Sequence, residues 1–250
     1  MDLFGAISAV AAVPGAPAWA RLWLVDLDDT HPDETILTTA ERARAARFAF
    51  GHDRRRFTAA RVALRALLAK EAGVDPQIEL RISAEGKPYV PGARAPFFNI
   101  SHSGRYALIA ISHSEEIGVD IEVVRPLHDL EALADRHFSR NERRAWRDDS
   151  FIGAGPLRFL QGWTRKEACL KALGTGLAVA TRTFEIVEAD GEGRVTIPIG
   201  GARWTVRHVG IELGEGLVAA VARVECDNSG MLRTCGKLNC DKAPSFEIRK

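Results

Sequence analysis

Apolar and polar residues alternate along residues 117–124, which read Ile-Gly-Val-Asp-Ile-Glu-Val-Val. A period of two built from β-branched residues predicts a half-buried strand with its apolar side chains toward a core. Asp120 and Glu122 would then share the opposite face, where two carboxylates at i and i+2 repel each other. A divalent cation would relieve that repulsion, and oxygen ligands favour magnesium, manganese or calcium over zinc. A solvated strand face carrying two acids is the alternative.

A helical pattern covers residues 156–173, with Pro156 suited to the first turn and Gly174 to the C-terminal cap. Four apolar residues fall on one stripe at helical spacing, namely Leu160, Trp163, Leu170 and Leu173. Glu167 lies in the same stripe, where a carboxylate is costly unless it is paired or bound to a metal ion. An ordinary helix pair with Lys171, one turn later, explains the lysine but not the apolar neighbours of Glu167.

A polar turn follows an apolar pair in the segment 97–106, Phe-Phe-Asn-Ile-Ser-His-Ser-Gly-Arg-Tyr, which leads into a buried strand at 107–112. Ser101, His102, Ser103 and the backbone of the turn are candidates for lining an anion site. A Ser–His nucleophile pair is discounted, because adjacent residues of an extended chain point to opposite sides.

The remaining patterns predict two successive halves that each combine strands and helices. The first half is expected to hold a helical region at 40–72 and strands at 21–27, 78–83, 97–100 and 106–112. The second is expected to hold helices at 127–147 and 156–173 and strands at 117–124, 183–188, 194–199, 203–209 and 217–224. We therefore predict an α+β fold with an N-terminal lobe, 1–113, and a C-terminal lobe, 114–225, that carries the candidate metal ligands. The aperiodic segment 226–250 is expected to be a mobile tail.

Charge is balanced over the chain but concentrated locally. The 250 residues are 46% hydrophobic, enough for one or two domains with a core, and the net charge is +1. Residues 42–65 nevertheless contain eight arginines against the single acid Asp53. An apolar stripe there predicts an amphipathic helix with a basic flank, suited to a phosphorylated ligand or an acidic protein. No nucleic-acid-binding module accompanies the arginines, so nucleic acid is not an expected partner.

Cysteine usage and hydropathy predict a cytoplasmic protein. Three of the four cysteines lie in the last 25 residues, without a Cys-x-x-Cys pair or a nearby histidine, so zinc is not expected. Few cysteines elsewhere suit a reducing compartment. No lysine or arginine precedes Arg21, which argues against a secretory signal, and no apolar run reaches the length of a membrane span.

Three motifs in this order resemble the surfactin-synthetase-activating (Sfp-like) type of the 4′-phosphopantetheinyl transferase superfamily. They are Phe-Asn-Ile-Ser-His-Ser, Gly-Val-Asp-Ile-Glu and Trp-Thr-Arg-Lys-Glu-Ala-Cys-Leu-Lys-Ala. Gly86-Lys87-Pro88 is similar to a further family motif, and the resemblance spans about residues 40–224. It implies a pseudo-two-fold pair of similar lobes with the active site between them.

The resemblance also implies an activity. The family transfers the phosphopantetheine arm of coenzyme A to a serine hydroxyl of an apo acyl or peptidyl carrier protein and releases adenosine 3′,5′-bisphosphate. It requires Mg²⁺, for which Mn²⁺ can substitute, and the resemblance implies a monomer. The positions that match metal ligands are Asp120, Glu122 and Glu167. The positions that match coenzyme A contacts are Arg44 at the 3′-phosphate and Lys87, Ser101, His102 and Lys171 at the phosphates.

Glu167, Lys171 and His102 are the expected catalytic residues. The base that takes the serine proton is either Glu167 or a metal-bound water, and the sequence leaves both open. A magnesium-dependent nucleotide pyrophosphohydrolase and a non-catalytic carrier-protein-binding module are the rival functions. The retention of all three acids together with Lys171 argues against the binding module, which has no need of them.

Overall fold

Two four-stranded antiparallel sheets form the centre of the molecule. The computed structural model describes residues 10–30, 32–147, 155–186, 191–214 and 216–225. The first sheet has the order β1 (Val10–Ala12), β2 (Arg21–Asp26), β6 (Tyr106–Ser112) and β5 (Phe97–Ser103). The second has the order β7 (Ile117–Val123), β10 (Leu217–Val224), β9 (Ala202–Glu212) and β8 (Glu192–Ile199). A small separate sheet pairs β3 (Arg81–Ile82) with β4 (Pro88–Tyr89).

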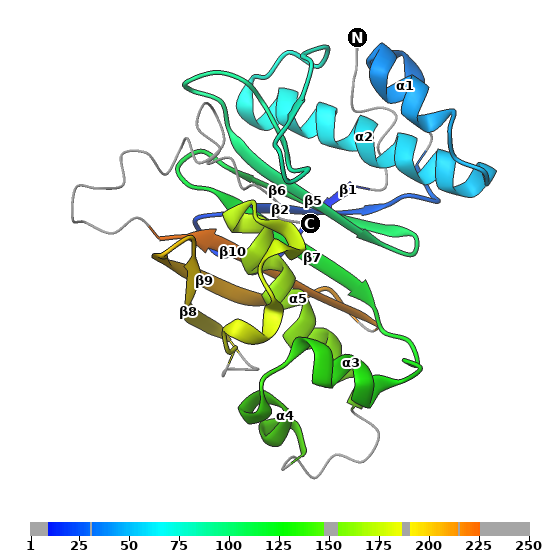
Figure 1. Cartoon of the computed structure of the whole chain (residues 1–250). Coiled ribbons are helices and arrows are strands. Elements are labelled where there is room, and N and C mark those ends of the chain that lie inside the picture. The colour runs from blue at the N-terminus through cyan, green and yellow to red at the C-terminus, as the bar shows by residue number, and fades with distance from the viewer. Residues whose placement is uncertain (1–9, 31, 148–154, 187–190, 215, 226–250) are drawn as a thin grey trace, which may run out of the picture.

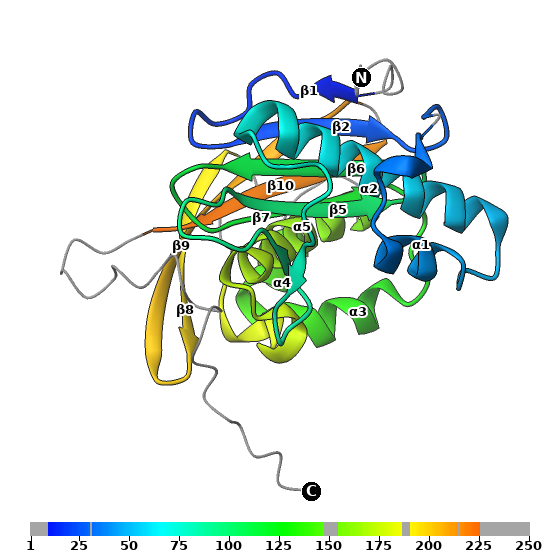
Figure 2. The same cartoon turned by 90° about the horizontal axis from the view of Figure 1, so that it is seen from above.

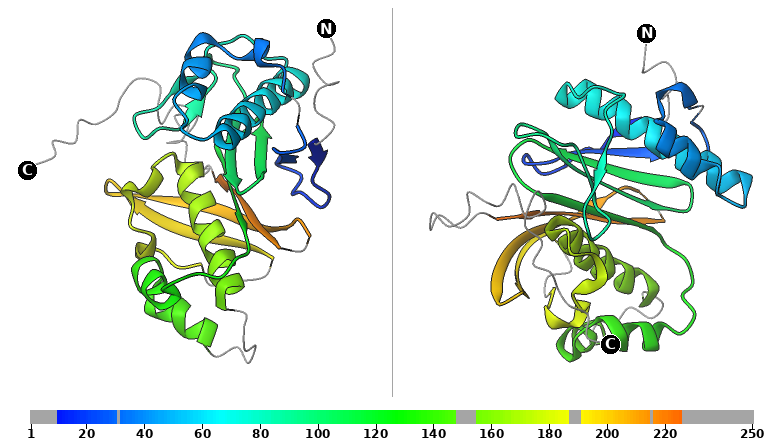
Figure 3. Two further views of the ribbon diagram at one scale, coloured as in Figure 1. Left: turned by 90° about the vertical axis from the view of Figure 1, so that its right-hand side faces the viewer. Right: turned by 45° about the horizontal axis from the view of Figure 1, so that its top comes forward.

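Each large sheet is covered by one long helix, α2 (Gly51–Ala72) on the first and α5 (Gly155–Leu173) on the second. The two sheets pack on each other through a shared apolar cluster that includes Leu22 and Leu108 from the first and Val119 from the second. The layers therefore run helix, sheet, sheet, helix (Figures 1 and 3). This architecture confirms the α+β fold class, and the lobe boundaries at 113 and 114 stay a prediction.

The predicted helical region 40–72 is two helices rather than one. Helix α1 (Thr39–Ala45) begins with a capping box in which the side chains of Thr38 and Glu41 each bond the other residue's backbone N–H. Residues 46–50 separate it from α2, and Phe50 is the N-cap of α2 without a side-chain hydrogen bond. Viewed from above, α2 crosses the strands of the first sheet and α1 lies beside its N-terminal end (Figure 2).

Several predicted limits need correction. Only residues 81–82 of the expected strand 78–83 form a strand, and the expected helix 127–147 is α3 (Leu130–His137) followed by α4 (Arg140–Arg147). No strand forms within the described part of 183–188, because a 3₁₀ turn at 181–183 leads into irregular backbone. The predicted tail 226–250, with its three cysteines, lies outside the described residues. No helix in the described ranges is both long and apolar enough to cross a membrane.

Strand β7 is buried on both faces rather than half-buried. Residues 117–121 are all buried, because the apolar face meets the first sheet and the other face meets α5. Gly118 allows this contact, since a Cβ built there would lie 2.2 Å from both the Ala168 oxygen and the Ala172 nitrogen. A glycine at this position therefore sets the distance between the acidic strand and the motif helix.

We expect Gly118→Ala to lower the free energy of unfolding by about 1–3 kcal/mol, because the added methyl meets helix backbone that can yield only by moving α5. Gly51→Ala is the matched control, since its Cβ would meet only the end of a side chain at 3.7 Å. Urea unfolding of the three proteins measures the difference. Equal midpoints for all three would contradict the close approach of α5 to β7.

Candidate active site

Polar side chains on one face of β5 join it to β7. They stand two residues apart, as a strand face requires, and are Asn99, Ser101 and Ser103. The Asn99 Oδ1 accepts a hydrogen bond from the Val119 N–H at 2.9 Å, and the Ser103 Oγ accepts one from the Val123 N–H at 3.1 Å. The partners advance together along both strands, so β5 and β7 run side by side in the same direction. This seam joins the two sheets at the predicted site.

The Asp120 carboxylate is the meeting point of both sheets and α5. Its Oδ1 accepts hydrogen bonds from the Ser101 hydroxyl at 2.8 Å and from the Lys171 ammonium at 2.6 Å. Lys171 also donates to the Ser101 Oγ at 3.0 Å, which closes a triangle of three side chains. Burial raises the pKa of Asp120, while Lys171 and Ser101 act in the opposite direction. The attraction within this largely buried pair is stronger than in water, but the cost of taking both charges out of water offsets much of that gain.

Glu122 and Glu167 lie within electrostatic reach of Asp120. The Glu122 Oε2 accepts a hydrogen bond from Ser103 at 2.7 Å and lies 3.3 Å from the Arg125 guanidinium. Burial raises the pKa of Glu167 to about 6; Lys171 opposes this shift, and the charges of Asp120 and Glu122 add to it. The structure thus places the three acids proposed as metal ligands within electrostatic reach of one another.

The donor chemistry of this acidic cluster fits a divalent cation. Asp120 Oδ2 and Glu167 Oε1 are buried side-chain oxygens without a hydrogen-bond partner. Such orphaned carboxylate oxygens are costly unless a cation or water satisfies them. No group of three or more His, Cys, Asp or Glu side chains among the described residues is arranged so that it could hold a metal ion as it stands. The three-ligand set therefore stays a prediction.

His102 projects from the opposite side of β5 to Ser101, as alternation along a strand requires. Its side chain is exposed, whereas Ser101 is buried against Asp120, so the two do not form a nucleophile pair. Desolvation by the surrounding protein lowers the pKa of His102, and the positive charges of Lys171 and Arg61 lower it further. The negative charges of Asp120 and Glu122 act in the opposite direction. The positive charges that act on this imidazole thus come from both α2 and α5.

A second group of cations surrounds the Phe57 ring on α2. The guanidinium carbons of Arg44 and Arg61 lie 5.4 Å and 5.6 Å from the ring centroid. Burial lowers the pKa of Arg61, and the nearby charges of Arg44 and Arg65 act in the same direction. Arg61 was not singled out from the sequence, because one arginine among eight in 42–65 carries no distinguishing pattern.

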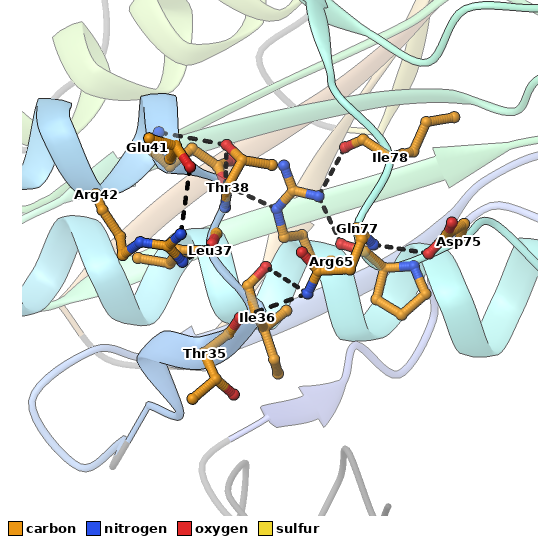
Figure 4. Close-up of polar contacts among 12 residues, drawn as sticks. Thr35, Ile36, Leu37, Thr38, Glu41, Arg42, Arg65, Asp75, Gln77 and Ile78 are labelled. Carbon is orange, nitrogen blue, oxygen red and sulfur yellow. Dashed lines mark hydrogen bonds and ion pairs between the residues drawn. The ribbon is translucent and has the colours of Figure 1, made fainter.

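Arg65, another member of that arginine-rich segment, has a structural role. Its side chain is only 2% exposed. It donates to the Glu41 carboxylate at 2.8 Å and to the carbonyl oxygens of Pro76 and Ile78 at 2.6 and 2.9 Å (Figure 4). It therefore fastens α2 to α1 and to the segment that follows α2, and is not available to a ligand.

Lys87 is largely buried against the start of β7 and the end of α5 rather than open to solvent. Its ammonium donates to Glu116 Oε2 at 2.7 Å, to the Ile117 oxygen at 3.0 Å and to the Ala172 oxygen at 3.4 Å. Burial lowers the pKa of Lys87, and Glu116 opposes that shift. Since three acceptors use its three N–H donors, Lys87 ties the start of β7 to the end of α5. Its predicted contact with a phosphate stays a prediction that requires one of these bonds to be given up.

Lys166, next to Glu167 in the chain, is a fully buried lysine that the sequence analysis missed. It donates to the carbonyl oxygens of Thr181 and Phe184 at 2.8 and 2.6 Å and pairs with the Glu142 carboxylate at 2.9 Å. These partners offset the cost of burying its charge. Lys166 thus anchors residues 181–184 against α5, and no local pattern could have revealed partners so far away in sequence.

Comparisons with known proteins agree with the order of the motifs. Residues 116–222 match the model of the 4′-phosphopantetheinyl transferase superfamily, and residues 24–114 match that of the 4′-phosphopantetheinyl transferase N-terminal region. The chain is 39% identical over 166 residues to 4′-phosphopantetheinyl transferase HetI of Nostoc sp., covering 63% of this chain and 70% of HetI.

Two further relatives come from distant organisms. The 4′-phosphopantetheinyl transferase Sfp of Bacillus subtilis is 30% identical over 170 residues, which cover 66% of this chain and 72% of Sfp. The L-aminoadipate-semialdehyde dehydrogenase-phosphopantetheinyl transferase of Xenopus laevis is 27% identical over 203 residues, which cover 70% of this chain and 67% of that protein. The two family models match the chain on either side of the seam between β5 and β7, where the motif residues form the candidate site. This chain therefore belongs to the 4′-phosphopantetheinyl transferase superfamily.

Proposed function

We propose that this chain transfers the 4′-phosphopantetheine arm of coenzyme A to a serine hydroxyl of an apo carrier protein. The reaction depends on Mg²⁺, which Mn²⁺ can replace, and releases adenosine 3′,5′-bisphosphate. The observation that carries the proposal is the buried Asp120 carboxylate, which pairs with Lys171 and lies within electrostatic reach of Glu167. The names of the relatives support the same activity. We further propose a monomer that resides in the cytoplasm, a reducing compartment for which the buried free thiol of Cys169 is suitable.

Coenzyme A is a polyanion, and the cations around the site are suited to its phosphates. Lys171 and His102 would donate to the pyrophosphate, because Lys171 bonds Asp120 and His102 lies within electrostatic reach of Asp120 and Glu122. Arg44, with Arg61 beside the same aromatic ring, would bind the 3′-phosphate. Lys87 would act chiefly through the backbone that it holds at β7 and α5.

Transfer requires a nucleophile without its proton and a stabilised leaving group. The serine oxygen bonds to the phosphorus next to the pantetheine arm, the pyrophosphate P–O bond breaks, and the nucleotide leaves with the oxygen. Glu167 is the candidate proton acceptor, with a water held by the cation as the alternative; in the metal-free chain burial raises the pKa of Glu167 to about 6. Asp120, Glu122 and Glu167 would hold the cation, which neutralises charge on the phosphates when bound. Lys171 adds a donor beside Asp120.

Incubation of the protein with coenzyme A, Mg²⁺ and an apo carrier protein tests the proposal by mass spectrometry. The expected result is a carrier that gains the mass of one phosphopantetheine group, with no gain when the carrier serine is replaced by alanine or when a chelator removes Mg²⁺. Free phosphopantetheine with an unmodified carrier would instead support a pyrophosphohydrolase. Intact coenzyme A and an unmodified carrier would contradict both activities.

We expect Arg44→Ala to weaken binding of coenzyme A more than binding of dephospho-coenzyme A, because only the former carries the 3′-phosphate. Loss of one charge-assisted hydrogen bond corresponds to about tenfold to a hundredfold in affinity. Titration calorimetry with both ligands measures the ratio. Arg194→Ala is the control, since Arg194 pairs with Glu225 on the second sheet. Equal losses for the two ligands in Arg44→Ala would remove Arg44 from the 3′-phosphate.

We expect Glu167→Gln to stabilise the metal-free protein at pH 8 and to leave its stability unchanged at pH 4. The folded chain holds the Glu167 proton more tightly than the unfolded chain, because the folded-state pKa is about 6 and the ordinary value is 4.5. Below pH 4.5 the group is protonated in both states, and stability is lost as the pH rises through 6. Urea unfolding in a chelator measures the difference.

Glu79→Gln serves as the control for that comparison, because Glu79 is exposed and outside the acidic cluster. It should match the wild type at both pH values. Asp120→Asn should instead lower stability at pH 8, because the loss of the charged acceptor for Lys171 and Ser101 outweighs the relief of the burial that raises the pKa of Asp120. A Glu167→Gln protein less stable than the wild type at pH 8 would show that this carboxylate is satisfied in the absence of metal.

A further inference from the structure

Residues 46–55, which join α1 to the first turn of α2, form a largely exposed stretch with two aromatic side chains, which we name the α1–α2 corner. Phe50 is 64% exposed and Phe48 is 38% exposed, and both rank among the few large apolar side chains at the described surface. Phe48 packs against Phe57 with ring centroids 5.3 Å apart, and Phe50 stacks on His52 at 5.7 Å. The corner therefore exposes apolar side chains whose orientation is fixed by contacts with neighbouring rings, which is typical of a binding surface.

Unpaired cations accompany these aromatic rings. Arg47 and Arg55 are exposed, and neither forms an ion pair with a carboxylate within the ranges that the structure describes. Other arginines of the same segment form ion pairs within the protein. Arg56 donates two hydrogen bonds of 2.7 and 2.6 Å to Asp28, and Arg65 pairs with Glu41. The structure thus separates the structural arginines from those that a partner can reach.

The corner adjoins the proposed phosphate site. Phe57, which supports Phe48, also lies beneath Arg44 and Arg61, and the charge of Arg61 reaches His102. In Figure 1 the corner lies on the right of the molecule, the same side as the turn between β5 and β6. A protein seated on the corner would therefore lie beside the cations that we assign to coenzyme A.

We infer that the α1–α2 corner is the docking surface for the carrier protein, which rests on the proposed function. Phe48 and Phe50 would contact an apolar patch of the carrier, and Arg47 and Arg55 would pair with its carboxylates. The excess of unpaired arginines selects an acidic partner. A second copy of this chain is disfavoured, because its own corner carries the same charge. So small a surface suits a transient, salt-sensitive encounter.

A double variant, Arg47→Glu with Phe50→Ser, tests the inference. The probe is the purified apo acyl carrier protein of a fatty-acid synthase, and transfer is followed at 50 and 300 mM NaCl. The matched control is Arg81→Glu with Ile82→Ser, an exposed arginine beside a 54% exposed apolar residue on β3. We expect the corner variant to raise KM for the carrier at least about tenfold at low salt and to flatten its salt dependence, since it removes one aromatic contact and reverses one charge.

The turnover number and KM for coenzyme A should stay at wild-type values in both variants, and the control should keep the wild-type KM for the carrier. Phe50→Ala alone, which keeps all charges, should raise KM for the carrier by a smaller factor. An unchanged KM for the carrier in the double variant overturns the docking surface, while wild-type transfer leaves the proposed function standing. A raised KM for coenzyme A alone would assign the corner to the nucleotide instead. Absence of transfer by the wild type overturns the proposed function and the docking inference together.

Discussion

The rest of the candidate site depends on the buried Asp120 carboxylate. One of its oxygens receives Ser101 from the first sheet and Lys171 from α5, so a single charged group connects three elements. Its other oxygen has no partner and is buried, which leaves the acidic cluster short of positive charge. A buried ion pair of this kind contributes little net stability but fixes which elements meet. In this chain it fixes α5 and the two sheets around the proposed reaction centre.

The helix can reach that carboxylate only because β7 offers no side chain at Gly118. The contact places Lys171 beside Asp120. At the start of β7, Lys87 donates to the Ile117 and Ala172 carbonyl oxygens and so joins β7 to the end of α5. Lys166 then anchors the far side of α5 to residues 181–184. Hydrogen bonds from Lys87 and Lys166 to backbone carbonyl oxygens thus fix α5, which carries Glu167 and Lys171, in place. Such a fixed arrangement of charges is what preorganised electrostatic catalysis requires.

Much of the fold followed from periodicity, because strands such as 106–112 and the motif helix at 156–173 have clear local patterns. The acids Asp120, Glu122 and Glu167 were also predicted, since carboxylates stood out against apolar neighbours. Contacts distant in sequence could not be predicted. Burial of β7 on both faces depends on α5, the structural role of Arg65 depends on Pro76 and Ile78, and Lys166 resembles a surface lysine until Glu142 folds against it. Arg61 was missed because only the fold brings its charge within reach of His102.

The most direct test is to measure how strongly the binding of Mg²⁺ and the binding of coenzyme A depend on each other, by titration calorimetry of coenzyme A with and without the metal. If the acidic cluster holds the cation against the phosphates, each ligand strengthens the other by the same factor in the wild type. The account predicts that this coupling disappears in both Asp120→Asn and Glu167→Gln, while coenzyme A still binds each variant through the arginines of α1 and α2 and the His102 imidazole of β5. Equal affinity of the wild type for coenzyme A with and without Mg²⁺ would contradict the account.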